Sequence, residues 1–132
     1  MIFDRLFSPP MSDSSRYEPE SLQWPESVLF RARGNLDIYT SPEFRSALEE
    51  SRSEGKKHFI LDLSAVDYID STGLGNLASF MDVVKKDRGS LKLSGLRGVV
   101  HKAFVFTNLL DLFSIFDTSN DAIESLGQEL SE

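Results

Sequence analysis

The hydrophobic residues in the middle of the chain follow two different periods, one after the other. Residues 58–63 form a short, mostly apolar run that is typical of a buried strand. The apolar residues after it recur every three or four positions, on one face of an α-helix; they are Leu74, Leu77, Ala78, Met81 and Val84. The pattern predicts a central strand that leads into an amphipathic helix over residues 72–87.

Shorter patterns on both sides predict the remaining elements. Residues 22–24 and 28–33 are typical of two strands, joined into a hairpin by a Pro-Glu-Ser turn. A helix then begins near Thr40, with a proline in its first turn, and ends at Gly55. The elements predicted after the central helix are a strand at 91–96, a helix at 99–106, a strand at 113–116 and a helix at 121–128.

This order of strands and helices predicts an α/β fold. Alternation of strand and helix favours parallel strands joined by right-handed crossovers, while the hairpin adds an antiparallel pair. We therefore expect one domain with a mixed, mostly parallel sheet of four or five strands, packed with about four α-helices.

The first 20 residues lack this periodicity and are rich in serine and proline. We expect residues 1–20 to be a flexible leader and residues 21–132 to be the domain. Phe3, Leu6 and Phe7 leave an alternative open, in which a short apolar turn of the leader docks on the domain or on a partner.

Composition narrows the class of protein. The absence of cysteine rules out disulfides and Cys-ligated metals and fits a reducing cytosol. No apolar run approaches the length of a membrane span, and the first residues lack the long apolar stretch of a signal peptide. The net charge of −7 argues against nucleic acid as a partner, because phosphates repel an acidic surface. We expect a cytoplasmic protein without membrane insertion.

The segment between the central strand and its helix concentrates the polar chemistry. Asp70 or Ser71 can cap the helix by accepting hydrogen bonds from N–H groups of its first turn. Gly73 and Gly75 let another backbone or a partner approach closely, at a cost in helix propensity. A hydroxyl at the positive end of a helix dipole is also a favourable place for a phosphate. The residue types leave both a structural cap and a phosphate-bearing site open.

Catalytic and metal-binding alternatives have weaker support. Ser71 can be combined with His58 or His101 into a triad, but neither histidine lies in a recognisable motif. Asp67 and Asp70 form a carboxylate pair for acid–base work, yet they lie in a loop with no sign of a substrate pocket. Metal-ligand spacings and the lysine of a phosphate-binding loop are missing from the sequence. We expect no enzyme activity, no metal and no cofactor.

Three short motifs, taken in order, resemble those of one protein family. The hexapeptide from Asp70 to Gly75 (Asp-Ser-Thr-Gly-Leu-Gly) is similar to the signature of the STAS domain of bacterial anti-sigma factor antagonists. Gly-Asn-Leu-Asp, ending at Asp37, resembles the family's Gly-x-Leu-Asp after an early strand. The helical segment from Val100 to Phe104 is the third match. The resemblance covers residues 27–126.

The resemblance implies a phosphorylation switch. In this family the first serine of the motif, here Ser71, is phosphorylated by an anti-sigma factor that is itself a serine kinase. The unphosphorylated protein binds the kinase and frees a sigma factor; phosphorylation from ATP ends the binding, and a phosphatase restores it. The second hydroxyl, Thr72, points about 100° away around the helix and is the less favoured acceptor. The implied partner-binding residues are Asp37, Asp70, Ser71, Thr72, Gly73, Leu74 and Gly75.

The resemblance also implies a second possible role. STAS domains occur as structural partners in lipid-transport, anion-transporter and stress-signalling assemblies, where the hydroxyl need not be phosphorylated. The intact Ser71-Thr72-Gly73 sequence favours the switch, while the leader leaves room for a larger assembly. Neighbouring reading frames distinguish the two roles, because a kinase-like ATPase accompanies a switch and transport components accompany a docking subunit.

Overall fold

Strands and helices alternate along residues 17–131, the part of the chain that the computed structural model describes. A first hairpin consists of β1 (Pro19–Ser21) and β2 (Ser27–Leu36). The later elements are α2 (Ser41–Ser53), β3 (His58–Ile69), α3 (Ser71–Lys86), β4 (Ser90–Ser94), α4 (Gly98–Phe106), the 3-10 turn η3 (Leu110–Leu112), β5 (Ser114–Phe116) and α5 (Ser119–Leu130). Their order is the one that the sequence predicts.

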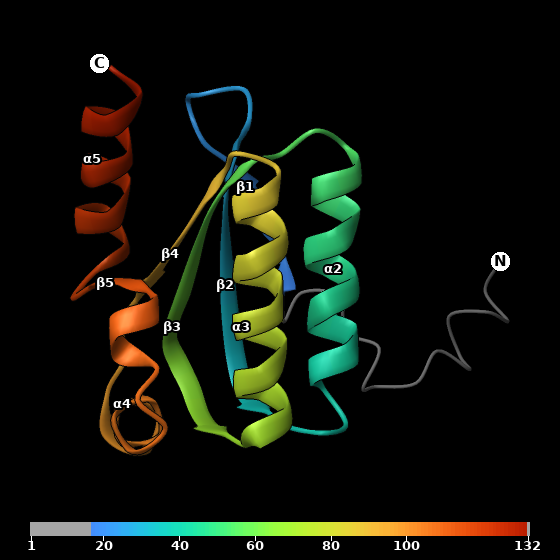
Figure 1. Ribbon diagram of the computed structural model, residues 1–132, viewed down its shortest axis with the longest axis vertical. Coiled ribbons are helices and arrows are strands. Elements are labelled where there is room, and N and C mark those ends of the chain that lie inside the picture. Colours follow the sequence, from blue (N-terminus) through green and yellow to red (C-terminus); the bar gives the residue numbers. More distant parts are fainter. Residues whose placement is uncertain (1–16, 132) are drawn as a thin grey trace, which may run out of the picture.

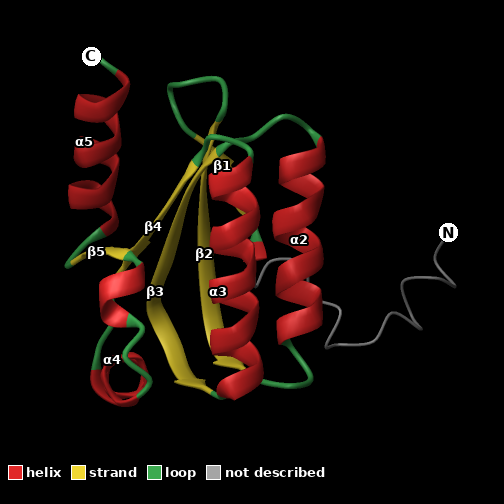
Figure 2. Cartoon of the chain, viewed as in Figure 1, coloured by secondary structure: helices red, strands yellow, loops and turns green. Residues whose placement is uncertain are grey.

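The strands form one sheet in their order along the chain, β1-β2-β3-β4-β5 (Figure 2). Strand β1 pairs antiparallel with β2, and every later pair is parallel. Each parallel step requires a crossover connection, and these contain α2, α3 and α4 in turn. The predicted α/β class and the mixed, mostly parallel sheet are confirmed.

Helices cover both faces of the sheet, but unequally (Figure 1). Alternate residues of a strand point to opposite faces. Thus Phe59 and Leu61 of β3 join a large cluster with α2, α3 and α4, whereas Ile60 between them joins a small cluster with α5. The ring of Phe59 stacks on Phe30 of β2 at 6.4 Å and meets Phe80 of α3 edge-on at 5.0 Å. Within residues 17–131, no helix has the length and apolar content needed to cross a bilayer.

The start of the sheet lies earlier than the sequence pattern predicts. The edge strand is Pro19–Ser21, not residues 22–24, and the predicted domain boundary at residue 20 falls inside it. Leu22 and Trp24 belong to the turn instead, where they pack on the α5 cluster. Tyr17 is buried, with its ring 5.0 Å from that of Phe44 in α2. The predicted flexible leader, with Phe3, Leu6 and Phe7, otherwise lies outside the described residues.

Strand β3 is twice as long as the sequence predicts. It continues from residue 63 to Ile69 and pairs with the second half of β2. The register of this pairing shifts between Arg31 and Arg33 and again between Gly34 and Asn35. Such irregularities interrupt the alternation of inward and outward residues, so a search for strict alternation misses this part of the strand. The longer β3 carries the chain across the molecule to the start of α3.

His58 lies at the other end of β3, where β3 and β4 begin side by side. Its Nδ1 is 2.9 Å from the hydroxyl oxygen of Ser90, and the side chain is half-buried. Burial lowers the pKa of His58 below its ordinary value of 6.5, and this effect outweighs the opposing charges of Glu26 and Glu129. The folded protein therefore favours the neutral imidazole.

We predict that acid weakens the fold through His58. Because its pKa is lower in the folded than in the unfolded state, the unfolded chain binds more protons between the two pKa values. The free energy of unfolding should fall as the pH drops through 6.5 and level off below the folded-state pKa. Urea titrations between pH 8 and pH 5 test this, with His58→Gln flattening that dependence and the exposed His101→Gln preserving it. Equal profiles for all three proteins would refute the assignment to His58.

Candidate functional site at the start of helix α3

Asp70 connects the first turn of α3 to the loop after β2. It is the N-cap residue of α3, and its Oδ1 accepts a hydrogen bond from the Gly73 N–H at 3.0 Å. Its Oδ2 accepts from the Ile38 N–H at 3.1 Å. In addition, the Asp70 N–H donates to the Leu36 carbonyl at 3.1 Å. Of the two caps that the sequence allows, the structure assigns the role to Asp70, which leaves the Ser71 hydroxyl unnecessary for capping.

Asp37 shapes the loop between β2 and α2. Its Oδ1 accepts hydrogen bonds from the N–H groups of Tyr39 at 2.9 Å and Thr40 at 3.0 Å. The Thr40 hydroxyl donates to the Asn35 carbonyl at 2.7 Å and accepts from the Asp37 N–H at 3.0 Å. These bonds form a compact turn of the kind that aspartate favours. Asp37 and Asp70 therefore order two loops that meet at one edge of the sheet.

Ser71 is the first residue of α3 and is exposed to solvent. Thr72, the other hydroxyl of the motif, is half-buried. The first N–H groups of a helix have no carbonyl one turn earlier, so those of Ser71 and Thr72 add to the positive end of the helix dipole. An anion on the Ser71 oxygen would lie close to these groups. The geometry favours Ser71 over Thr72 as a site for modification.

The two glycines of the motif have different surroundings. A Cβ on Gly73 would lie 2.5 Å from the Leu36 carbonyl oxygen and 2.7 Å from Cγ1 of Ile69. The absence of a side chain there lets α3 approach the end of β2. A Cβ on Gly75 would meet nothing within 4 Å, and Gly75 is exposed. The close approach of α3 to β2 explains why residue 73 is glycine. Of the two glycines, only Gly75 lies where a partner could approach its backbone.

Leu74, which the sequence also placed at the partner surface, is buried. It packs in the main cluster between α3 and the sheet. Its side chain therefore supports the surface from beneath. Of the seven predicted partner-binding residues, Ser71 and Gly75 are exposed, Asp37, Asp70 and Thr72 are half-buried, and Gly73 and Leu74 are buried.

Large apolar side chains beside Ser71 form a part of the surface that the sequence analysis missed. Ile38 and Tyr39 are 59% and 84% exposed, and Tyr68 at the end of β3 is also exposed. The hydrogen bond from the Ile38 N–H to Asp70 fastens this loop to the start of α3. The sequence does contain a signal for this surface, because two large apolar residues, Ile38 and Tyr39, stand in a predicted loop between a strand and a helix. Exposed apolar groups of this kind mark interaction surfaces.

Ser71 and His58 lie too far apart to act together as a catalytic Ser-His pair. This histidine begins β3, Ser71 follows its end, and a strand of that length separates them by more than about 30 Å. His101 is exposed on α4. Among residues 17–131, no three His, Cys, Asp or Glu side chains are grouped as metal ligands.

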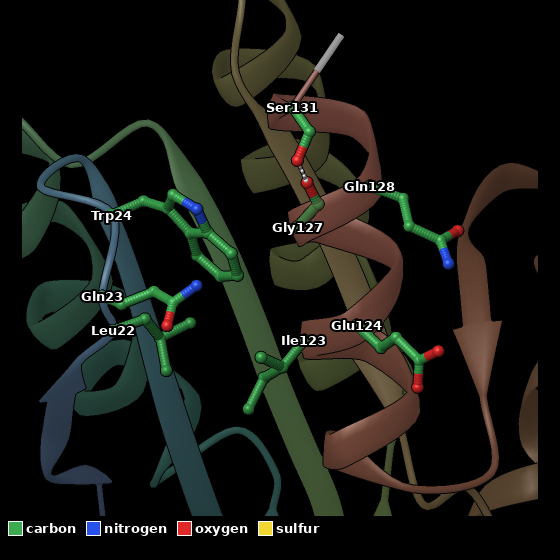
Figure 3. A pocket seen from close by; sticks show the side chains of 8 residues that line it. All are labelled: Leu22, Gln23, Trp24, Ile123, Glu124, Gly127, Gln128 and Ser131. Carbon is green, nitrogen blue, oxygen red and sulfur yellow. Dashed lines mark hydrogen bonds between the residues drawn. The ribbon is translucent and has the colours of Figure 1, made fainter.

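A separate groove lies between the turn after β1 and helix α5 (Figure 3). Trp24 points across it toward Gly127, where an added Cβ would come 2.8 Å from the Trp24 ring, and Ile123 points from α5 toward Leu22. The residues that line it are Leu22, Gln23, Trp24, Ile123, Glu124, Gly127, Gln128 and Ser131. Because α5 packs on the sheet face opposite α3, the groove is separate from the Ser71 surface.

The sequence matches a known domain family and named relatives. The family model of the STAS domain matches residues 18–122. The anti-sigma-B factor antagonist of Staphylococcus aureus is 32% identical over 82 residues, which cover 62% of this chain and 76% of that relative.

Solved structures show the same fold at lower identity. SpoIIAA in its unphosphorylated form, an anti-sigma factor antagonist, aligns with a TM-score of 0.74 and 21% identity, over 85% of this chain and 96% of that one. SpoIIAA of Bacillus in its phosphorylated form aligns with a TM-score of 0.67 and 21% identity, over 83% and 98%. A sulfate transporter family protein from Wolinella succinogenes aligns at 0.73 and 19% identity, over 86% and 93%. Since the family model covers most of the chain, this protein belongs to the STAS domain family.

Proposed function

We propose that this protein is an anti-sigma factor antagonist that works by partner switching. Unphosphorylated, it binds an anti-sigma factor that is also a serine kinase, through the surface around Ser71, and so releases a sigma factor in the bacterial cytoplasm. The relatives named as anti-sigma factor antagonists support this role. The observation that carries the switch is the exposed Ser71 hydroxyl beside a helix cap that Asp70 already supplies.

Phosphorylation of Ser71 would change the surface more than the fold. The Ser71 oxygen bonds to the γ-phosphorus of ATP and its proton is released to a base of the kinase and then to solvent, while the P–O bond to ADP breaks and ADP leaves. The new group carries about −1.5 to −2 charges at neutral pH. Because Ser71 is exposed and its hydroxyl is not the cap of α3, the added group meets solvent instead of core. The helix dipole favours its charge, so the fold should persist.

The same charge would disrupt a docked partner. A partner that covers Ile38 and Tyr39 must also cover Ser71, because Asp70 holds the two segments together. A phosphate there would have to lose its water next to apolar side chains, with Asp67 and Asp70 already close in the sequence. Release therefore follows from charge and desolvation without refolding. A phosphatase that removes the phosphate restores binding.

We predict opposite behaviour for two Ser71 variants. Ser71→Ala should keep the binding surface and retain a kinase-like ATPase from the source cells, whereas Ser71→Asp should weaken that binding at least about tenfold. Mass spectrometry of proteins captured on each bait identifies the kinase. The purified kinase with labelled ATP should phosphorylate the wild type and the control Thr72→Val, but not Ser71→Ala.

Two results would contradict this function. Phosphate transfer to Ser71→Ala would place the modification elsewhere. Capture of the same transport or scaffold subunits by both baits would favour the structural role that the resemblance to STAS domains also implies. In that case Ser71 is only the first residue of a helix.

A further inference from the structure

Helix α4 has apolar side chains on two sides, although only one side packs on the sheet. Val100 and Phe104 are fully buried in the main cluster. On the other side, Val99 is exposed and Phe106 is 82% exposed. Residues spaced by three, four or seven share a helix face, so Val99, Lys102 and Phe106 form one outward face. Large apolar side chains that are exposed together mark interaction surfaces, so Val99 and Phe106 indicate a docking face on α4.

The outward face of α4 is held in a defined position. Asn108 adopts a left-handed conformation with φ of 59°, and the Leu109 N–H behind it donates to the Phe104 carbonyl at 3.0 Å. Leu109 packs against the main cluster, and the ring of Phe104 meets that of Phe113 at 5.8 Å. Phe106 is thus presented from an anchored helix end, and little conformational entropy is lost when a partner binds it.

The charge of this face is opposite to that of the whole chain. The protein has 21 acidic residues and a net charge of −7, yet residues 88–110 contain no aspartate or glutamate. Lys102 lies on the outward face itself, and Arg97 is exposed at the start of the helix. The surface of α4 therefore complements a partner that offers an apolar pocket with carboxylates at its rim.

The α4 face adjoins the candidate site. Helix α4 packs against β3, whose last residue directly precedes Asp70, and Figure 1 shows α4 at the edge of the molecule where α3 begins. The exposed Tyr68 lies on β3 just before this point. The start of α3 and helix α4 therefore lie at the same end of the molecule, which makes α4 a candidate second contact for a protein docked at Ser71.

We propose that the outward face of α4, formed by Val99, Lys102 and Phe106, is a second contact of the kinase partner and selects that partner by apolar and charge complementarity. The inference rests on the proposed function. Ser71 reports the phosphorylation state, whereas α4 contributes affinity in both states. An anionic membrane is the less favoured occupant, since the helix is short and the whole chain would be repelled by the negative surface.

The test measures affinity for the purified kinase that the Ser71→Ala bait retains. Calorimetric titration compares wild type with Phe106→Ser and Lys102→Glu. The controls are Leu130→Ser, an exposed apolar residue on α5, and Lys85→Glu in the last turn of α3, about 20 Å from Ser71. We expect Phe106→Ser to lower affinity at least about tenfold and Lys102→Glu about threefold to tenfold, with controls unchanged. Urea unfolding checks that all variants stay folded.

Each outcome decides between the proposals. If both α4 variants bind like wild type while Ser71→Asp still binds weakly, the α4 contact is wrong and the phosphorylation switch stands. If α4 variants and controls lose affinity equally, selection by this face is also refuted. If no kinase is retained, the proposed function fails and the inference fails with it. Sedimentation of wild type, but not Phe106→Ser, with phosphatidylglycerol vesicles would assign the face to a membrane and overturn the kinase contact.

Discussion

Gly73→Ala should lower the free energy of unfolding by about 2–3 kcal/mol. The added Cβ would lie 2.5 Å from the Leu36 carbonyl oxygen and 2.7 Å from Cγ1 of Ile69, closer than van der Waals contact allows. One of these atoms is backbone and cannot rotate away, so α3 must shift from β2 as a unit. The shift also strains the Asp70 hydrogen bonds to Ile38 and Gly73. Urea unfolding monitored by circular dichroism measures the loss.

Gly75→Ala is the matched control for this prediction. It lies in the same helix, two residues away, and its added Cβ would meet nothing within 4 Å. Replacing an interior helix glycine with alanine usually stabilises a protein by about 0.5–1 kcal/mol. The two variants should therefore shift the urea midpoint in opposite directions. Equal losses would mean that a cause common to both positions, and not the approach of α3 to Leu36, explains the effect of Gly73→Ala.

Phe59→Ala should destabilise the protein more, by about 3–5 kcal/mol. Phe59 lies at the centre of the large cluster, where its ring contacts those of Phe30 and Phe80. The truncation removes apolar contact and leaves a cavity between β3 and α3, because neighbouring strands and helices cannot collapse fully into it. Thermal and urea unfolding should both report the loss.

An exposed phenylalanine provides the comparison for Phe59. Phe106→Ala removes the same atoms from a side chain that is 82% exposed, so stability should change by no more than about 0.5 kcal/mol. Phe59→Leu should fall between the two, because most of the volume is kept. A Phe106→Ala loss comparable to that of Phe59→Ala would mean that Phe106 is covered within the chain, and it would remove the basis of the α4 contact.

Two structural features make the proposed switch surface rigid. Asp37 closes the loop after β2, and Asp70 fastens that loop to α3 through two amide hydrogen bonds. The exposed residues Ile38, Tyr39 and Ser71 therefore move together. A phosphate on Ser71 then changes a surface that is already formed, which is why we expect loss of binding without loss of structure.

Most of the secondary structure and the position of the motif could be predicted from the sequence, because they depend on interactions between residues close together in the chain. The spacing of Leu74, Leu77 and Met81 reports a helix face, and Asp70 and Ser71 are both good caps for the helix that follows. The order of strands and helices along the chain, the α/β class and the position of the motif agree with these patterns. Two element boundaries differ from the prediction: β1 starts earlier because residues 22–24 form a turn, and β3 runs further because two register shifts interrupt the alternation.

The sequence by itself determined the hydrophobic pattern, the negative charge, the cap candidates and the motif, since each depends on residue type or on neighbours within about one helical turn. Only the tertiary structure decided between Asp70 and Ser71 as the cap. It also showed that residue 73 must be glycine because α3 approaches Leu36 closely, and it placed Ile38 and Tyr39 beside the start of α3. The cap bond itself is local, from the Gly73 N–H to Asp70, but the close approach at Gly73 and the position of Ile38 depend on contacts between residues more than thirty positions apart. They exist only after β2 and β3 pair in parallel and bring the ends of both strands to one edge.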